Sequence, residues 1–165
     1  MSYERALNLA FETQMLRSTI AAIMLSIVVP LAASAETWRN GFGQGVLEAW
    51  VEKGPGNKIN IACESGWGRP ITGISSTLAG QSPAPHSTVT LTFDAKDPVD
   101  VRVDEIGSIN SNCRACAGWL ELVRDQLKAS GSVYVRFCDG LGTRFGLKGA
   151  ANAIGECQAD FWKTF

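Results

Sequence analysis

The sequence predicts a mainly β domain with β-sandwich-like antiparallel sheets, one medium helix and a short C-terminal helix. Three observations support this fold class. Apolar and polar residues alternate in several short runs, as they do in half-buried strands. After Gly107 the apolar residues recur at three- and four-residue steps, which is typical of an amphipathic helix. Glycine, proline and aspartate residues that favour turns separate these runs.

The first 35 residues, 1–35, have the composition of a secretory signal. Arg17 precedes an apolar stretch from Ile20 to Leu31, and Ala33-Ser34-Ala35 supplies the small residues of a cleavage site. This stretch is about 12 residues long, whereas roughly 20 are needed to span a bilayer. We therefore expect a cleaved signal and no permanent membrane span. Whether the signal starts at the first residue or at Met15 stays open.

Residues 36–165 are expected to form a single mature β-rich domain. About 130 residues bury roughly two thirds of the surface of the unfolded chain, which is enough for one core. The formal net charge is −1, and lysine and arginine residues do not cluster. Nucleic acid is not an expected partner, because its recognition requires clustered cations.

The clearest strand signals are Val46–Glu52 and Lys58–Glu64, which a glycine- and proline-containing turn separates. In the second run the alternation directs Cys63 toward the core. The glycine-rich segment 41–45 before them predicts a flexible start of the domain. Further strand signals are residues 71–78, 88–93, 99–103, 133–137 and 145–147.

A helix is expected from an N-cap at Asn112 to a stop at Gly131. One apolar face would serve as its buried side, and charged residues lie opposite. A second, short helix is expected at 149–156. The apolar face of the longer helix consists of Ala115, Trp119, Leu122, Val123 and Leu127.

All five cysteines lie in the mature part, where an oxidising compartment favours disulfides. Which thiol stays unpaired, and how the others connect, stays open. A zinc site is not expected, because the only histidine, His86, lies in a proline-rich loop without a spaced partner. No metal or other cofactor is predicted. The disulfide candidates are Cys63, Cys113, Cys116, Cys138 and Cys157.

Cys113 and Cys116 form a Cys-x-x-Cys motif at the expected start of the helix. Backbone N–H groups at a helix start stabilise a thiolate, so this is an arrangement for a dithiol redox site. A structural disulfide is the favoured interpretation, because the motif follows antiparallel strands and not a buried parallel strand.

No other enzymatic chemistry is predicted. A nucleophilic triad would need the single histidine, and no Gly-x-Ser-x-Gly turn is present. The carboxylates of Asp94, Asp97, Asp100 and Asp104 are interpreted as solvated strand edges. The sequence thus predicts a protein without catalytic residues.

A loop with Trp67 between two glycines and Arg69 two residues later is the candidate binding site. Tryptophan and arginine are enriched where proteins meet partners. Alternatively, Trp67 folds back over the sheet as a lid. Trp38 and Trp162, near the mature termini, are expected to pack.

The layout resembles the invasion-associated locus B family of exported proteins from the Gram-negative envelope. The matching features are the strand Ile59–Cys63, the close pair Cys113 and Cys116 before a helix, and the segment Gly146–Ile154 after a hairpin. The sequence departs from the family in lacking a tryptophan at the start of the first cysteine strand and in the tighter cysteine pair. The resemblance implies a periplasmic or secreted β-sandwich involved in host-cell invasion, without catalytic residues.

The sequence thus leads to two main hypotheses. The first is a non-enzymatic envelope module that binds an unidentified envelope or host protein; inhibition of an incoming enzyme such as lysozyme is one form of it. The second is a periplasmic thiol–disulfide redox protein that uses Cys113 and Cys116. The oligomeric state stays open.

Overall fold

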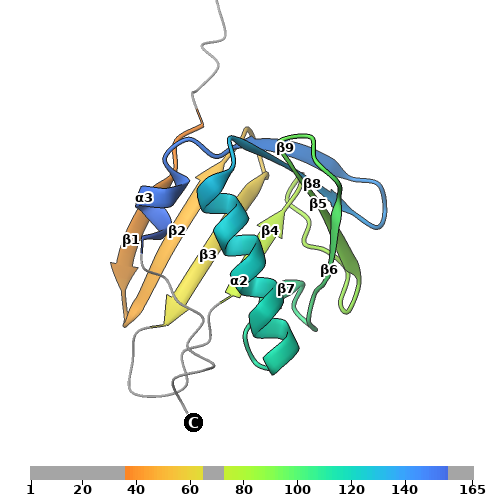
Figure 1. The fold of residues 1–165 in the computed structure, drawn as a ribbon, viewed down its shortest axis with the longest axis horizontal. Coiled ribbons are helices and arrows are strands. Elements are labelled where there is room, and N and C mark those ends of the chain that lie inside the picture. The colour runs from red at the N-terminus through yellow and green to blue at the C-terminus, as the bar shows by residue number, and fades with distance from the viewer. Residues whose placement is uncertain (1–35, 65–72, 156–165) are drawn as a thin grey trace, which may run out of the picture. The chain divides into compact units, whose positions relative to one another are not determined.

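Two antiparallel sheets frame the domain in the computed structural model, which describes residues 36–64 and 73–155 (Figure 1). Within these residues, one sheet has the strand order β1-β2-β3-β4-β7 and the other has the order β6-β5-β8-β9. The predicted fold class, antiparallel β with a medium and a short helix, is confirmed. The elements are β1 (Arg39–Gly43), β2 (Val46–Glu52), β3 (Lys58–Glu64), β4 (Gly73–Thr77), β5 (Thr88–Phe93), β6 (Val99–Arg102), β7 (Ser108–Asn110), α2 (Arg114–Ala129), β8 (Ser132–Phe137), β9 (Gly142–Gly146) and α3 (Ala150–Ile154).

The alternation in the sequence explains which face of each sheet is buried. In the pairing of β2 with β3, Ala49 lies opposite Ile61, and both are buried. In the other sheet, Leu91 of β5 lies opposite Val135 of β8, and both are buried as well. Because side chains alternate across a strand, each sheet turns its apolar face inward and leaves polar residues outside. The prediction that Cys63 faces the core is confirmed, since it is 8% exposed.

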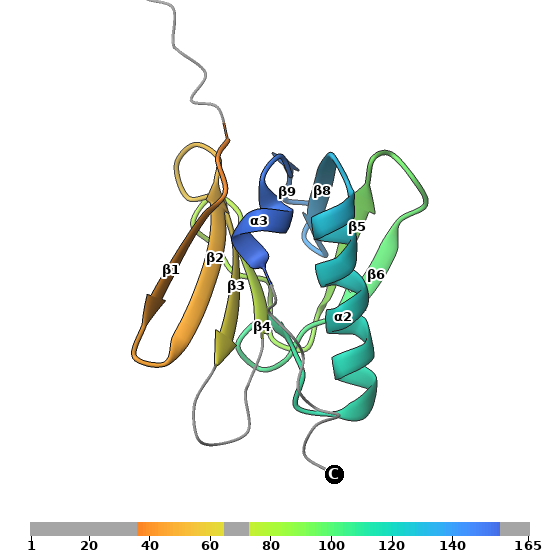
Figure 2. The ribbon, with the colours of Figure 1, turned by 60° about the vertical axis from the view of Figure 1, so that its left-hand side comes forward.

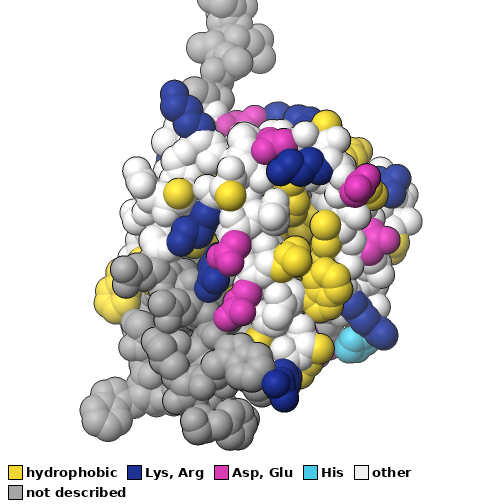
Figure 3. Space-filling view, viewed as in Figure 1, with side chains coloured by type: hydrophobic (Ala, Val, Ile, Leu, Met, Phe, Trp, Pro, Cys, Tyr) yellow, Lys and Arg dark blue, Asp and Glu magenta, His cyan; other side chains and the backbone are white. Residues whose placement is uncertain are grey.

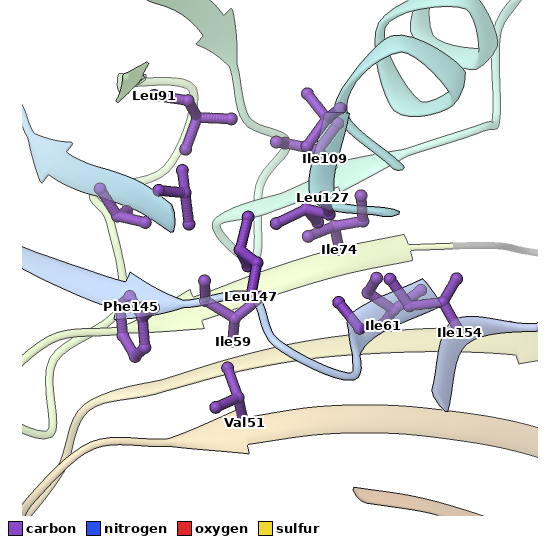
Figure 4. Packing of buried hydrophobic residues seen from close by; sticks show 14 of the residues in the cluster. Val51, Ile59, Ile61, Ile74, Leu91, Ile109, Leu127, Phe145, Leu147 and Ile154 are labelled. Atoms are coloured by element: carbon purple, nitrogen blue, oxygen red, sulfur yellow. The ribbon is translucent and has the colours of Figure 1, made fainter. Parts of the chain in front are cut away.

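The two helices close one side of the space between the sheets (Figure 2). Val123 and Leu127 of α2 line a small core cavity of about 20 Å³ together with Ile74 of β4 and Leu91 of β5. Figure 4 shows these side chains meeting those of α3, such as Ile154, in one core. Since α2 packs against residues of both sheets, this packing fixes the position of its N-terminal turn at the surface. None of the helices in residues 36–64 and 73–155 has the length and apolar character needed to cross a membrane.

Three details differ from the sequence prediction. The segment predicted to be a flexible start, residues 41–45, largely belongs to β1, which pairs with the edge of β2. The helix N-cap is Cys113 and not Asn112, whereas the expected stop at Gly131 is confirmed, because Ser130 is the C-cap and Gly131 follows it. The short strand β7 was not predicted. Three residues are too few to show a strand pattern in the sequence, and β7 forms because it pairs with β4.

The N-terminal segment of the domain is fastened to β9. The Trp38 indole donates a hydrogen bond from Nε1 to the Gly146 carbonyl over 3.2 Å, and the side chain is buried, as predicted. Glu36 accepts a short hydrogen bond from the Gly146 backbone N–H. It also forms an ion pair of 2.9 Å with Lys53 in the β2–β3 turn. The chain that precedes β1 is thus held against two separate hairpins.

Gly56 in the β2–β3 turn is predicted to be the least replaceable glycine of this turn. Its φ is +73°, and a Cβ on it would lie 2.4 Å from the Gly80 nitrogen, where the Gly80 N–H donates to the Gly56 carbonyl. Gly56→Ala should therefore lower the free energy of unfolding by more than about 2 kcal/mol.

Urea unfolding followed by circular dichroism would measure this loss. Gly54→Ala is a matched control, because Gly54 also has a positive φ, +60°, but has open space around its would-be Cβ. Gly54→Ala should lower the free energy of unfolding by about 1 kcal/mol, the cost of placing alanine at a positive φ. Equal losses for Gly54→Ala and Gly56→Ala would contradict the role of the close approach.

Candidate functional site

The N-terminus of α2 carries a disulfide between Cys113 and Cys116, whose Cα atoms are 5.0 Å apart. Cys113 has extended backbone angles and caps the helix: its Sγ accepts a hydrogen bond of 3.1 Å from the Cys116 backbone N–H. Cys113 is exposed, whereas Cys116 is half-buried. The structure therefore brings together the two cysteines of the sequence motif, and it presents one sulfur atom to solvent.

A pocket of about 270 Å³ lies beside this disulfide. Its walls come from the first two turns of α2, from the β6–β7 segment and from the loop before β5, and they are mainly apolar. On the α2 side the lining residues are Ala115, Cys116 and Trp119. On the opposite side they include His86, Arg102, Asp104 and Glu105, so polar side chains border the pocket there.

An apolar strip on α2 continues outward from the pocket. Trp119 is 44% exposed and Leu122 is 42% exposed, and the two residues lie three positions apart on one helix face. Ile106, 73% exposed, lies in the β6–β7 turn, whose neighbours Glu105 and Ser108 line the pocket. Figure 3 shows hydrophobic side chains gathered over α2 with basic side chains and the histidine at one edge.

The exposure of this strip corrects the sequence prediction for the helix. The expected buried face included Ala115, Trp119 and Leu122, but these three residues are exposed and α2 buries a narrower stripe. A helix presents only part of its circumference to two sheets, so the apolar residues on its flank remain at the surface. Sequence periodicity could not separate the two groups, because both follow three- and four-residue spacing. The residues of α2 that are buried are Ala117, Leu120, Val123 and Leu127.

Asp104 shapes the opposite wall of the pocket. Its Oδ1 accepts hydrogen bonds from the backbone N–H groups of Ile106 and Ser108, and its Oδ2 accepts one from the Asn110 amide over 2.6 Å. Partial burial raises the pKa of Asp104, but the hydrogen bonds from Ser108, Asn110, Ile106 and Gly107 outweigh it, so the pKa lies below its ordinary value. This carboxylate therefore organises the turn before β7.

Asp94 has a similar role at the other end of the domain. The backbone N–H groups of Gly131 and Ser132 donate to its carboxylate and lower its pKa. Asp94 and Asp104 follow strand ends, and Asp94 is exposed, as the interpretation of solvated strand edges expects. Their carboxylates also accept hydrogen bonds, which alternation patterns do not reveal: Asp94 fixes the turn between α2 and β8, and Asp104 fixes the turn between β6 and β7.

The other cysteines differ in their surroundings. Cys63, at the end of β3, is buried and forms a disulfide. Cys138 follows β8 and is an exposed free thiol. Cys157 lies outside the described residues. The two candidate binding residues, Trp67 and Arg69, also lie outside the described residues, as does Trp162, which was expected to pack. His86, for which no metal site was expected, lines the pocket.

No group of three or more histidine, cysteine, aspartate or glutamate side chains in the described part of the chain is arranged to hold a metal ion. The pocket combines largely apolar walls with Cys116 of the disulfide and with polar side chains such as Arg102 and Asp104.

Comparison with known proteins gives one finding about the family. A family model described as YfjT matches residues 36–154. The matched region spans every strand and helix of the two-sheet domain. No curated protein and no solved structure matches the chain.

The hydrogen bonds to Asp104 predict a pH-dependent contribution to stability. Its pKa is lower in the folded than in the unfolded chain, so the stabilisation is complete above the ordinary value near 4 and disappears as the pH falls through the folded-state pKa. Asp104→Asn should lower the free energy of unfolding at pH 7 by about 1 kcal/mol after allowance for solvent screening.

Denaturant unfolding at pH 7 and at a series of lower pH values would measure this effect. The variant and the wild type should begin to converge as the pH falls below about 4, and should coincide only below the lowered folded-state pKa of Asp104. Asp100→Asn is the matched control, because Asp100 is an exposed β6 carboxylate with a hydrogen bond to the Thr90 hydroxyl. A difference that stayed constant down to acid pH would exclude the carboxylate as its source.

Proposed function

The chain belongs to the YfjT family, and from the surface beside α2 we propose that its domain is a non-enzymatic protein-binding module of the bacterial envelope. The observation that supports this proposal is the continuity of the pocket with exposed Trp119 and Leu122. Tryptophan in a partly enclosed apolar site is the side chain most often found to dominate protein interfaces. The sequence resemblance to exported invasion-associated proteins and the signal-like segment 1–35 favour the envelope.

The dimensions of the site favour a protein over a small molecule. Pockets for drug-sized ligands enclose about 300–1,000 Å³ and bury most of the ligand. A pocket of about 270 Å³ is smaller, and the apolar surface continues beyond it onto Leu122 and toward Ile106. We therefore propose a partner protein that inserts one apolar side chain beside Trp119 and covers the neighbouring strip. Arg102 at the border would favour an acidic residue next to that side chain.

The interaction predicts a strong effect of Trp119→Ser. Loss of a central tryptophan typically costs at least about 2 kcal/mol of binding free energy, which corresponds to roughly a 30-fold weaker complex. The fold should persist, because Trp119 is 44% exposed and the core face of α2 is unchanged.

Photo-cross-linking in the periplasm would test this prediction. A photoreactive residue at Leu122 should give a discrete adduct with one protein, and excess wild-type domain, but not the Trp119→Ser variant, should compete it away. The matched control is a photoreactive residue at Phe42, which is also exposed but lies on β1. Equal competition by wild type and variant, or the same adduct from both positions, would refute the α2 surface.

One form of this proposal is that the partner is an enzyme, lysozyme, which the domain inhibits by binding it. Purified domain added to lysozyme should lower the rate of cell-wall hydrolysis if this enzyme is the partner, and Trp119→Ser should restore that rate. Unchanged hydrolysis with the wild-type domain would exclude lysozyme and leave the cross-linked protein as the candidate partner.

A further inference from the structure

We propose that the Cys113–Cys116 disulfide exchanges with protein thiols and oxidises a dithiol substrate. This activity is distinct from partner binding through Trp119, although the two sites share the first turns of α2. The proposal rests on three features. The disulfide is accessible, it closes a loop too short to stabilise the fold much, and the N-terminus of α2 would stabilise its reduced form.

Accessibility distinguishes this disulfide from the second one in the chain. Cys113 is exposed at the helix N-cap, whereas Cys63, which is also disulfide-bonded, is 8% exposed. Thiol–disulfide exchange requires direct approach of a thiolate to a sulfur atom. A substrate can therefore reach Cys113, and the half-buried Cys116 is the leaving sulfur.

A purely structural purpose explains the Cys113–Cys116 disulfide poorly. It joins residues three positions apart, and the constraint that a disulfide places on the unfolded chain grows with the length of the closed loop. The helix is already fixed by Leu120, Val123 and Leu127, which are buried in the core. Opening this disulfide should thus leave the fold intact, as an exchange site requires.

The helix N-terminus stabilises the reduced form. The Cys116 N–H already points at Cys113 Sγ over 3.1 Å, and no acidic residue lies in the first turn of α2. A thiolate on Cys113 would therefore accept this hydrogen bond and interact favourably with the positive end of the helix. Stabilisation of the reduced form makes a disulfide a better oxidant.

The reaction balances in two exchange steps. A substrate thiolate attacks Cys113 Sγ, forms a mixed disulfide and releases Cys116 as a thiolate, which takes a proton from solvent. The second substrate thiolate then attacks the substrate sulfur of the mixed disulfide. The substrate disulfide forms, and Cys113 leaves as a thiolate. Two electrons have moved from the substrate dithiol to the cysteine pair. A disulfide such as oxidised glutathione restores the starting state by the reverse exchange.

The pocket gives the substrate a place to bind. Cys116, Ala115 and Trp119 line it on the α2 side, so a polypeptide with an apolar residue near its cysteine can lie across the pocket with its sulfur at the helix N-terminus. The substrate class is therefore an incompletely oxidised protein segment with two cysteines and a nearby apolar side chain.

The test uses the mature protein with Cys138→Ser, which removes the exposed free thiol and leaves both disulfides. After equilibration in mixtures of reduced and oxidised glutathione, alkylation and mass spectrometry would quantify each disulfide. Cys113–Cys116 should open at a reduced-to-oxidised ratio at least tenfold lower than the Cys63 disulfide. Equal resistance of the two disulfides would overturn the proposal.

Single-turnover oxidation of a reduced two-cysteine peptide supplies the functional measurement. The oxidised protein should form about one peptide disulfide per molecule, at a rate at least tenfold above that of the Cys113→Ser, Cys116→Ser double variant. For the single variants, the remaining cysteine is first converted to its mixed disulfide with glutathione, and the peptide carries one cysteine. In Cys116→Ser the peptide thiolate should then displace glutathione and stay bound to Cys113 as a mixed disulfide, and in Cys113→Ser the same exchange at Cys116 should be at least tenfold slower. Rates equal to the double variant's would overturn the proposal.

Thermal unfolding separates this role from a structural one. The double variant should retain the circular dichroism spectrum of the wild type and lose less melting temperature than Cys63→Ser. A larger loss than that of Cys63→Ser would assign the disulfide a structural role and overturn the proposal. The cross-link from Leu122 and the glutathione equilibrium are separate measurements on the same protein, so a failure of partner binding and a failure of thiol exchange remain distinguishable.

Discussion

The burial of one face of α2 between two sheets is the constraint on which the other features depend. Val123 and Leu127 contact the same core cavity as Ile74 of one sheet and Leu91 of the other, so the helix cannot rotate without exposing apolar surface. This fixed rotation has two effects. It directs Trp119 and Leu122 outward beside the pocket, and it holds the capping residue Cys113 at the surface. The core thus determines which chemistry is presented to solvent.

The opposite wall of the pocket depends on polar contacts. Asp104 accepts three hydrogen bonds, one from Ile106 in the β6–β7 turn and two from Ser108 and Asn110 of β7. β7 itself pairs with β4 over only three residue pairs. A strand this short is not stable through its own ladder. The carboxylate and the ladder together hold Ile109, which is buried, and the pocket wall next to it. One wall is therefore set by apolar packing and the other by a charged turn.

Much of the fold follows from local sequence patterns, and the site follows only in part. The bounds of β2 and β3 agree with the predicted runs, because their alternation and the turn between them are strong local signals. The missed strands, β1 and β7, have weak patterns and owe their structure to neighbours distant in sequence. The cysteine pair at the helix start was visible in the sequence. The pocket was not, because its walls come from segments that only the tertiary fold brings together.

Some apolar residues of α2 are buried in the core, and others are exposed beside the pocket; the proposed functions depend on the exposed ones. A helix needs only a limited stripe to join a core, and the residues Leu120, Val123 and Leu127 already provide it. Trp119 and Leu122 add little to that core but keep a large apolar area in contact with water. Single exposed apolar residues are ordinary on protein surfaces, but adjacent ones bordering a pocket form a patch. The position of this patch next to an accessible disulfide places recognition and sulfur chemistry within reach of the same bound polypeptide.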